Sequence, residues 1–278
     1  LANDGRYTGL FIIIFYWIAT FIAVGGTKLL SKVTSFGFVI GTVIPGIIVI
    51  VLGIVWIVMK KPLGFEELTA TETTVAKVVD GVAKARWLPD LTNLNNLSYL
   101  SGIVLLFAGV EVQAVHASEM KNPKKQYPLA IFISAIIVVA LFTFGSLAIA
   151  AVVPNSELQI ESGLMQALST MLKSVKMSWA LPVLAFCVAF GSLAGVLSWI
   201  SGPSKGLLST AKEGILPESL AETTKAGAPK NMMLIQGIIV TILACLYFVM
   251  KDVSVAFFLL SALTIAVYII MYLMMYAA

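Results

Sequence analysis

The residue best placed to do chemistry in this sequence is Glu111, a carboxylate inside a long apolar run. It stands in the segment FAGVEVQAVH, and no other apolar run of the chain contains a carboxylate. In hydrocarbon an ionised side chain is unfavourable unless it is paired or protonated, and such residues usually serve a function. We therefore interpret Glu111 either as a structural carboxylate that bridges its helix to a neighbour or as a group that takes up and releases protons.

Gly109 predicts a break in the same helix. Glycine adopts backbone conformations that other residues avoid, so a helix is easily interrupted there. An interrupted helix leaves backbone carbonyls without partners, and a membrane tolerates these only where protein or a water-filled cavity satisfies them. Transporters direct such carbonyls at a substrate near the middle of the bilayer. The pattern therefore favours a membrane carrier of small solutes.

His116 is the only histidine of the chain. It lies about 140° around a regular helix from Glu111, so the two side chains are not expected to form a pair. Because imidazole titrates near neutral pH, His116 is either a wetted side chain at a helix end or, with Glu111, a candidate for pH sensing. One histidine without an aspartate in any apolar run supplies neither a nucleophile–base pair nor a metal-ligand set. An intramembrane enzyme, a metal and a cofactor are therefore not expected.

Aromatic side chains mark two further apolar runs. Trp199 follows a series of small residues that would let another backbone or a solute approach closely, and it is either an interfacial anchor or a substrate contact. Tyr268, Tyr272 and Tyr276 recur at i, i+4 and i+8, which places their phenols on one helix face. Such a stripe is packing or, because phenol hydroxyls seek partners in lipid, the wall of a polar cavity.

Composition sets the class of protein that must hold these residues. Of the 278 residues, 59% are hydrophobic and 12% are charged, and the mean hydropathy is +0.99. Ordinary soluble domains carry about 25% charged residues. The chain is therefore predicted to be an all-α integral membrane protein in a lipid bilayer. Its net charge of +4 can be placed at one membrane face, so no nucleic-acid partner is expected.

The apolar runs approach or exceed the roughly 20 residues that cross a bilayer. They are Leu10 to Val24, Phe36 to Met59, Leu97 to Ala117, Pro128 to Val153, Trp179 to Ile200, Met232 to Met250, and Val253 to Ala278. The first ends at the glycine pair Gly25 and Gly26, and the second carries Pro45-Gly46, which predicts a kink.

The polar connections give the expected arrangement in the membrane. Residues 60–96 are predicted to form a charged loop with one short helix over 73–85. Residues 156–175 have leucines at helical spacing, which is typical of an amphipathic helix at the membrane surface or over the bundle. The loops on the side of the KNPKK turn are rich in lysine and poor in acids, so they are predicted to be cytoplasmic, including residues 204–230.

Four blocks carry a resemblance to a known family. They are GGTKLLSKVTSFGF, GVEVQAVHASEMKNPKKQYPLA, SWISGPSKGLLSTAKEGILP and LTIAVYIIMYLMM, and they occur in the expected order. The chain resembles the amino acid–polyamine–organocation permeases, most of all their glutamate/GABA antiporter branch, the exchangers of bacterial acid resistance.

The resemblance implies a fold and a set of site residues. The fold would be a LeuT-like pair of inverted five-helix repeats, of which this chain is a fragment. Residues 1–59 would supply helices 4 and 5, residues 60–96 an extracellular loop, and residues 97–278 helices 6 to 10, with helix 6 broken at Gly109 to Glu111. Carbonyls near Phe107 and Ala108 would face the substrate amino group. The implied transport-path residues are Phe107, Ala108, Gly109, Glu111, Trp199, Tyr268 and Tyr272.

The implied activity is exchange of glutamate, or a similar amino acid, for GABA by alternating access across a bacterial plasma membrane. One departure bears on the substrate: four residues before Trp199, where the antiporter branch has a glutamate, this chain has Gly195. An exchanger of another amino acid within the superfamily is therefore one alternative. A non-transporting sensor with a permease fold is the other.

Overall fold

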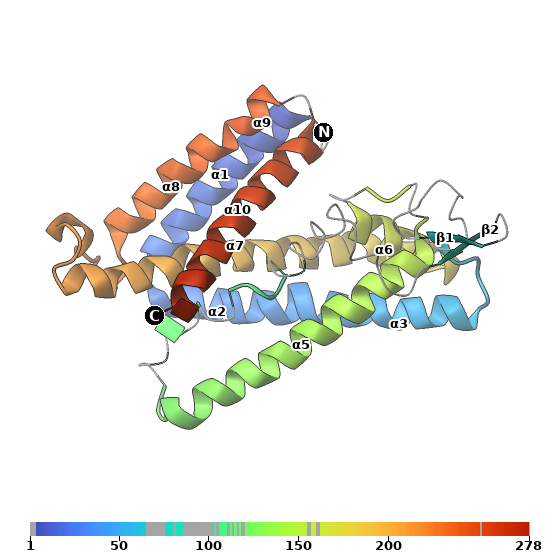
Figure 1. Cartoon of the computed structure of the whole chain (residues 1–278), viewed down its shortest axis with the longest axis horizontal. Coiled ribbons are helices and arrows are strands. Elements are labelled where there is room, and N and C mark those ends of the chain that lie inside the picture. Colours follow the sequence, from blue (N-terminus) through green and yellow to red (C-terminus); the bar gives the residue numbers. More distant parts are fainter. Residues whose placement is uncertain are drawn as a thin grey trace. The chain divides into compact units, whose positions relative to one another are not determined.

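The structure is a computed structural model and is almost entirely helical (Figure 1). It describes residues 4–64, 76–79, 82–85, 103, 106–109, 112, 114–115, 117, 120–154, 157–159, 162–250 and 252–277. Within these ranges, six helical segments are long and apolar enough to cross a membrane. They are Gly5–Val24, Leu30–Val58, Pro123–Val152, Ser178–Lys212, Lys230–Val249 and Val253–Ala277.

The predicted class, an all-α multi-pass membrane protein, is confirmed. Six of the predicted spans correspond to these segments, whereas the predicted span over 97–117 falls mostly outside the described residues. The first span is longer than predicted because Asp4 caps it: the Asp4 carboxylate accepts hydrogen bonds from the backbone N–H groups of Arg6, at 2.9 Å, and Tyr7, at 3.4 Å. Such a cap satisfies N–H groups that have no partner inside the helix.

One predicted element is wrong. Instead of a short helix over 73–85, the structure has two antiparallel strands, β1 (Ala76–Val79) and β2 (Val82–Ala85), with Val79 paired to Val82. The sequence between the strands is Asp-Gly, which is among the strongest hairpin signals between β-prone residues. The hairpin signal in the sequence therefore favours two strands over the predicted helix.

The chain divides into two compact units. The first unit contains α1 (Gly5–Val24), α2 (Thr27–Phe38), α8 (Lys230–Ala244) and α9 (Leu246–Val249), most of α7 (Leu181–Lys212) and the first part of α10 (Val253–Ala277). Within it α1 runs beside α8 and α9 (Figure 1). The indole N–H of Trp17 on α1 donates to Thr241 Oγ1 on α8 at 3.0 Å, which fixes the register of these two helices.

The predicted kink at Pro45 takes the form of a widened turn. Residues Val39–Val43 are π-helical, and they join α2 to α3 (Ile44–Val58) without a break. Pro45 has no N–H to give to the carbonyl of Gly41, and its ring crowds that carbonyl, so the preceding turn opens. The helix that begins at Thr27 therefore continues through the predicted kink to Val58.

The second unit is built on α3, on α5 (Pro123–Val152) beyond Ile131, and on α6 (Gly163–Ser174). Leu168, Met171 and Leu172 of α6 are buried against the ends of α3 and α5, in a cluster that includes Trp56 and Val152. The helix α6 lies inside the predicted amphipathic connector 156–175. Its leucines pack on other helices, which favours a covering role over a plain connector.

Candidate functional site

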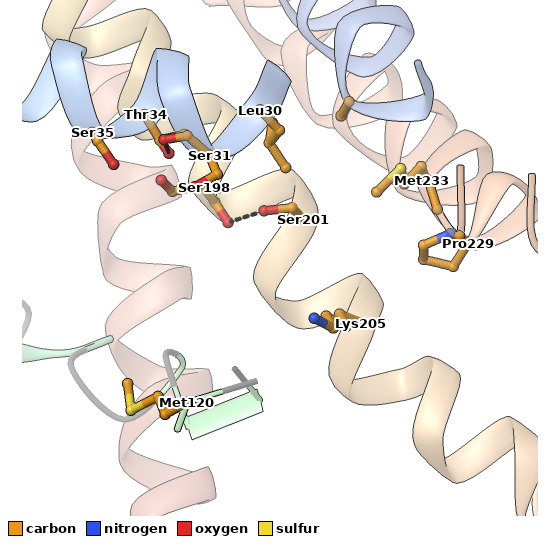
Figure 2. Close-up of a pocket in the computed structure, with 13 residues that line it drawn as sticks. Leu30, Ser31, Thr34, Ser35, Met120, Ser198, Ser201, Lys205, Pro229 and Met233 are labelled. Atoms are coloured by element: carbon orange, nitrogen blue, oxygen red, sulfur yellow. Dashed lines mark hydrogen bonds between the residues drawn. The ribbon is translucent and has the colours of Figure 1, made fainter. Parts of the chain in front are cut away.

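The first unit contains a cavity of about 420 Å³ bordered by α2 and α7. Hydroxyl groups from the two helices face one another across it: Ser31, Thr34 and Ser35 of α2, with Ser198 and Ser201 of α7 (Figure 2). The other residues that line the cavity are Ala23, Leu30, Met120, Lys205, Gly227, Ala228, Pro229 and Met233.

Helical spacing explains why the hydroxyls gather. Ser31, Thr34 and Ser35 stand at i, i+3 and i+4, and Ser198 and Ser201 at i and i+3, so each set occupies one face of its helix. Two of them bond to their own helix: Thr34 Oγ1 donates to the Ser31 carbonyl at 3.1 Å, and Ser201 Oγ to the Ser198 carbonyl at 3.2 Å.

The two helices reach this position because they touch elsewhere along their length. A Cβ atom added to Gly191 of α7 would lie 2.7 Å from the backbone of Gly41, so the two backbones are in direct contact. A Cβ atom added to Gly37 would overlap that of Ala194. Small residues allow such contact between membrane helices. The crossing fixes α2 against α7, and the hydroxyl-lined cavity lies further along both helices.

The chemistry of the lining suits a small polar solute. Hydroxyl groups donate and accept hydrogen bonds, and the ammonium group of Lys205 supplies a positive charge at the same cavity. Charge-assisted hydrogen bonds of this kind are the strong ones for a carboxylate. Another part of the lining is apolar, because Leu30, Ala228 and Met233 belong to a buried cluster with Leu197 and Ile200 of α7. The arrangement can hold an amphipathic molecule with one anionic end.

The predicted helix break has a clear signature at Gly109. Phe107 is helical, Ala108 and Gly109 form a turn, and Gly109 has φ 96°, a conformation that favours glycine. The next described residue, Val112, is in a 3-10 turn and its N–H donates to the Gly109 carbonyl at 3.2 Å. Glu111 and His116 lie outside the described residues.

The chain that follows this turn lies against α7. A Cβ atom on Gly202 would be 2.7 Å from Val112 Cγ1, and one on Gly206 would be 3.2 Å from Val115 Cγ1. Gly202 and Gly206 stand at i and i+4, so they present one smooth face to these valines. The helix α7 thus contacts both α2 and the segment after the break.

The remaining predicted site residues are distributed over the two units. Trp199 belongs to the first unit with Gly109, and its side chain is 45% exposed. Phe107, Tyr268 and Tyr272 belong to the second unit together with Ala108. There the rings of Tyr268 and Tyr272 are 5.7 Å apart, as expected for neighbours on one helix face, and the Phe107 ring meets Phe142 edge-on at 6.4 Å.

Sequence reasoning missed the α2 side of the cavity and Lys205. The signal was present, since Ser31, Thr34 and Ser35 form a polar face that leads into an apolar helix. The predicted cytoplasmic loop 204–230 includes Lys205, whereas in the structure α7 continues to Lys212. A lysine predicted to lie beyond a helix end therefore lies on the helix that borders the cavity.

Comparisons with known proteins agree with this architecture. The chain matches the amino acid permease family over residues 1–278. It is 37% identical over 278 residues to an uncharacterized transporter of Legionella pneumophila, and the match covers 100% of this chain and 56% of the relative. It is 32% identical over 274 residues to a glutamate/gamma-aminobutyrate antiporter of Lactococcus lactis, covering 98% of this chain and 51% of the relative.

A cadaverine/lysine antiporter of Escherichia coli strain K12 is 26% identical over 254 residues, covering 90% of this chain and 51% of the relative. The chain thus spans about half the length of the curated relatives it matches. The relatives with a stated function are antiporters and not enzymes, and the resemblance seen in the four sequence blocks is confirmed. The family match over the whole chain, together with its membrane-spanning helices, shows that this chain belongs to the amino acid permease family.

Proposed function

We propose that the full-length protein is a secondary-active antiporter that exchanges glutamate, or a similar amino acid, for GABA by alternating access. The observation that carries the proposal is the interrupted helix: Gly109 turns at φ 96° inside an apolar run, and the chain after it packs on α7. A break of this kind exposes backbone groups to a solute in the membrane. The glutamate/GABA antiporter of Lactococcus lactis, 32% identical, supports the choice of substrates.

Within this proposal, the chain supplies helices 4 to 10 of a permease, and Glu111 is the proton-responsive group of the transport path. Trp199, Tyr268 and Tyr272 line that path, and the carbonyls near Phe107 and Ala108 receive the substrate amino group. Exchange of an anionic amino acid for its decarboxylated product removes one proton equivalent from the cytoplasm, which suits a role in acid resistance at a bacterial plasma membrane.

Exchange of another amino acid is the second candidate, and two observations favour it. Gly195 stands where the antiporter branch has a glutamate, and the cadaverine/lysine antiporter of Escherichia coli is 26% identical. The replacement of that glutamate by glycine removes a charge, so a substrate preference that depends on this charge is not retained in this chain.

Counterflow separates these candidates. Liposomes that contain the full-length protein and are loaded with GABA are expected to take up labelled glutamate, and protein-free liposomes are not. If cadaverine-loaded liposomes took up labelled lysine and GABA-loaded liposomes did not take up glutamate, the second candidate would be favoured. Binding of an amino acid without any counterflow would contradict both and would leave the sensor.

A further inference from the structure

A proline inside α7 leaves one backbone carbonyl without its usual partner. In a regular helix the N–H of each residue donates to the carbonyl four residues earlier. Pro203 has no N–H, so the carbonyl of Trp199 receives no hydrogen bond from that position. Inside a membrane an unsatisfied carbonyl is unfavourable by several kcal/mol, and a proline is tolerated only where another group takes the place of the missing donor.

Gln236 of α8 provides that donor. Its side-chain Nε2 donates to the Trp199 carbonyl at 3.3 Å. Its Oε1 accepts a hydrogen bond from the Ser204 hydroxyl at 3.0 Å. Ser204 follows Pro203 directly and is only 2% exposed, so this hydroxyl is held in place by packing.

The two bonds fix the orientation of the Gln236 amide. An amide has a donating and an accepting end, and here each end faces a partner of the opposite kind. Ser204 therefore aims Gln236 at the carbonyl that the proline exposes. The same pair of bonds explains why α7 continues to Lys212 through a residue that usually ends or kinks a helix.

We propose that Gln236 is a positioning residue for Trp199, which it holds by clamping the carbonyl left open by Pro203. The inference rests on the proposed function in one respect, namely that Trp199 contacts the transported amino acid. Gln236 itself needs no contact with the substrate. Its role is to fix the backbone from which the indole projects, and through it the angle of α7 against α8.

If Gln236 takes the place of the N–H that Pro203 lacks, its hydrogen bond to the Trp199 carbonyl should contribute to thermal stability only while residue 203 is proline. Gln236→Met keeps a similar shape but removes both hydrogen bonds. In the full-length protein in detergent we expect it to lower Tm clearly. In a Pro203→Ala background the restored N–H can donate to the Trp199 carbonyl, so the same substitution should shift Tm much less. Equal Tm shifts in the two backgrounds would overturn the clamp, and this arm does not depend on transport.

The positioning role is tested by counterflow kinetics in liposomes. Gln236→Met should raise KM for the exchanged amino acid about 3- to 10-fold, in proportion to the loss of one hydrogen bond, with a smaller change in kcat. It should raise KM no further in a Trp199→Ala background. The matched control is Thr241→Val, which removes a hydrogen bond between α8 and α1 and should leave KM unchanged.

The outcomes separate the two hypotheses. A rise in KM that persists in the Trp199→Ala background would overturn the positioning role and assign Gln236 to the substrate or to packing. Wild-type protein without counterflow would overturn the proposed function and the role in transport together. Non-equal Tm shifts in the same preparation would then still support the clamp as a feature of the fold.

Discussion

At the scale of single residues, Trp199 lies on an exposed face of α7, one helical turn after Gly195. Its side chain is 45% exposed and its carbonyl is bonded to α8, so truncation removes the ring without removing a core residue. If the indole contacts the substrate, Trp199→Ala should slow exchange roughly tenfold or more, which corresponds to about 1.4 kcal/mol. The measurement is counterflow in liposomes that contain equal amounts of folded protein.

Trp179 offers the matched control for this substitution. It lies at the start of the same membrane-spanning segment, Ser178–Lys212, and its side chain is 72% exposed. Trp179→Ala should change the exchange rate by less than about twofold, since the substitution removes a ring that makes few packing contacts. Equal losses in the two variants would assign Trp199 to packing.

Gly195 of α7 has room for a larger side chain. A Cβ atom added there would meet nothing within 4 Å, and the residue is exposed on the helix. Gly195→Glu should therefore fold. It would place a carboxylate one turn from Trp199, at the position where the antiporter branch that the chain resembles has a glutamate.

The expected result is a changed ratio of glutamate to lysine uptake at neutral pH, compared with the wild type, because the added charge acts on the two substrates in opposite directions. Gly195→Gln is the control, since it has nearly the same shape without the charge and should leave the ratio close to that of the wild type. A shift of equal size in both variants would mean that volume, and not charge, changed the preference.

At the scale of the helices, Gly41 in the π-helical turn that follows α2 contacts Gly191 and so holds this helix against α7. A Cβ atom on Gly191 would lie 2.7 Å from Gly41, closer than packed atoms can approach, and the neighbour is backbone that cannot rotate away. Gly191→Ala should therefore separate the helices and destabilise the protein by about 1–3 kcal/mol. Thermal unfolding of the full-length protein in detergent measures the loss.

Gly195 again supplies the comparison, on the same helix and one turn away. Gly195→Ala meets no neighbour, and alanine favours a helix over glycine by about 1 kcal/mol in water, so its Tm should be unchanged or raised. If both variants lost the same stability, the close approach of α2 and α7 would not be a determinant of the fold.

Several features at this scale could be predicted from the sequence because their causes are local. The glycine pair Gly25-Gly26 ends α1, Pro45 disturbs the helix in the turn before it, and the apolar spacing in α6 places Leu168 and Met171 in a core. Each depends on backbone chemistry or on helical periodicity within a few residues. Such signals are visible in the sequence of one segment alone.

The features that could not be predicted depend on contacts between distant segments. The fifth predicted span ends at Ile200, but α7 continues through Pro203 to Lys212, and Gln236 donates to the Trp199 carbonyl, which the proline cannot reach with an N–H of its own. Ser31 and Lys205 line one cavity because two glycine-rich helices cross beyond it. No local pattern records which carbonyl a distant side chain will reach, so this part of the site emerged only from the fold.

At the scale of the whole molecule, the proposed exchange moves charge. At neutral pH glutamate carries one net negative charge and GABA none, so each one-for-one turnover that imports glutamate carries one negative charge inward. A membrane potential of 100 mV changes the free energy of such a step by about 2.3 kcal/mol. Liposomes loaded with GABA should therefore take up glutamate faster when their interior is made positive with a potassium gradient and valinomycin, and slower when it is made negative.

Exchange of GABA for labelled GABA moves no net charge and serves as the control, since its rate should be much less sensitive to potential. Equal glutamate uptake at both potentials would mean that a compensating ion travels with the substrate, or that glutamate crosses as a neutral species, and it would contradict the exchange of anionic glutamate for GABA.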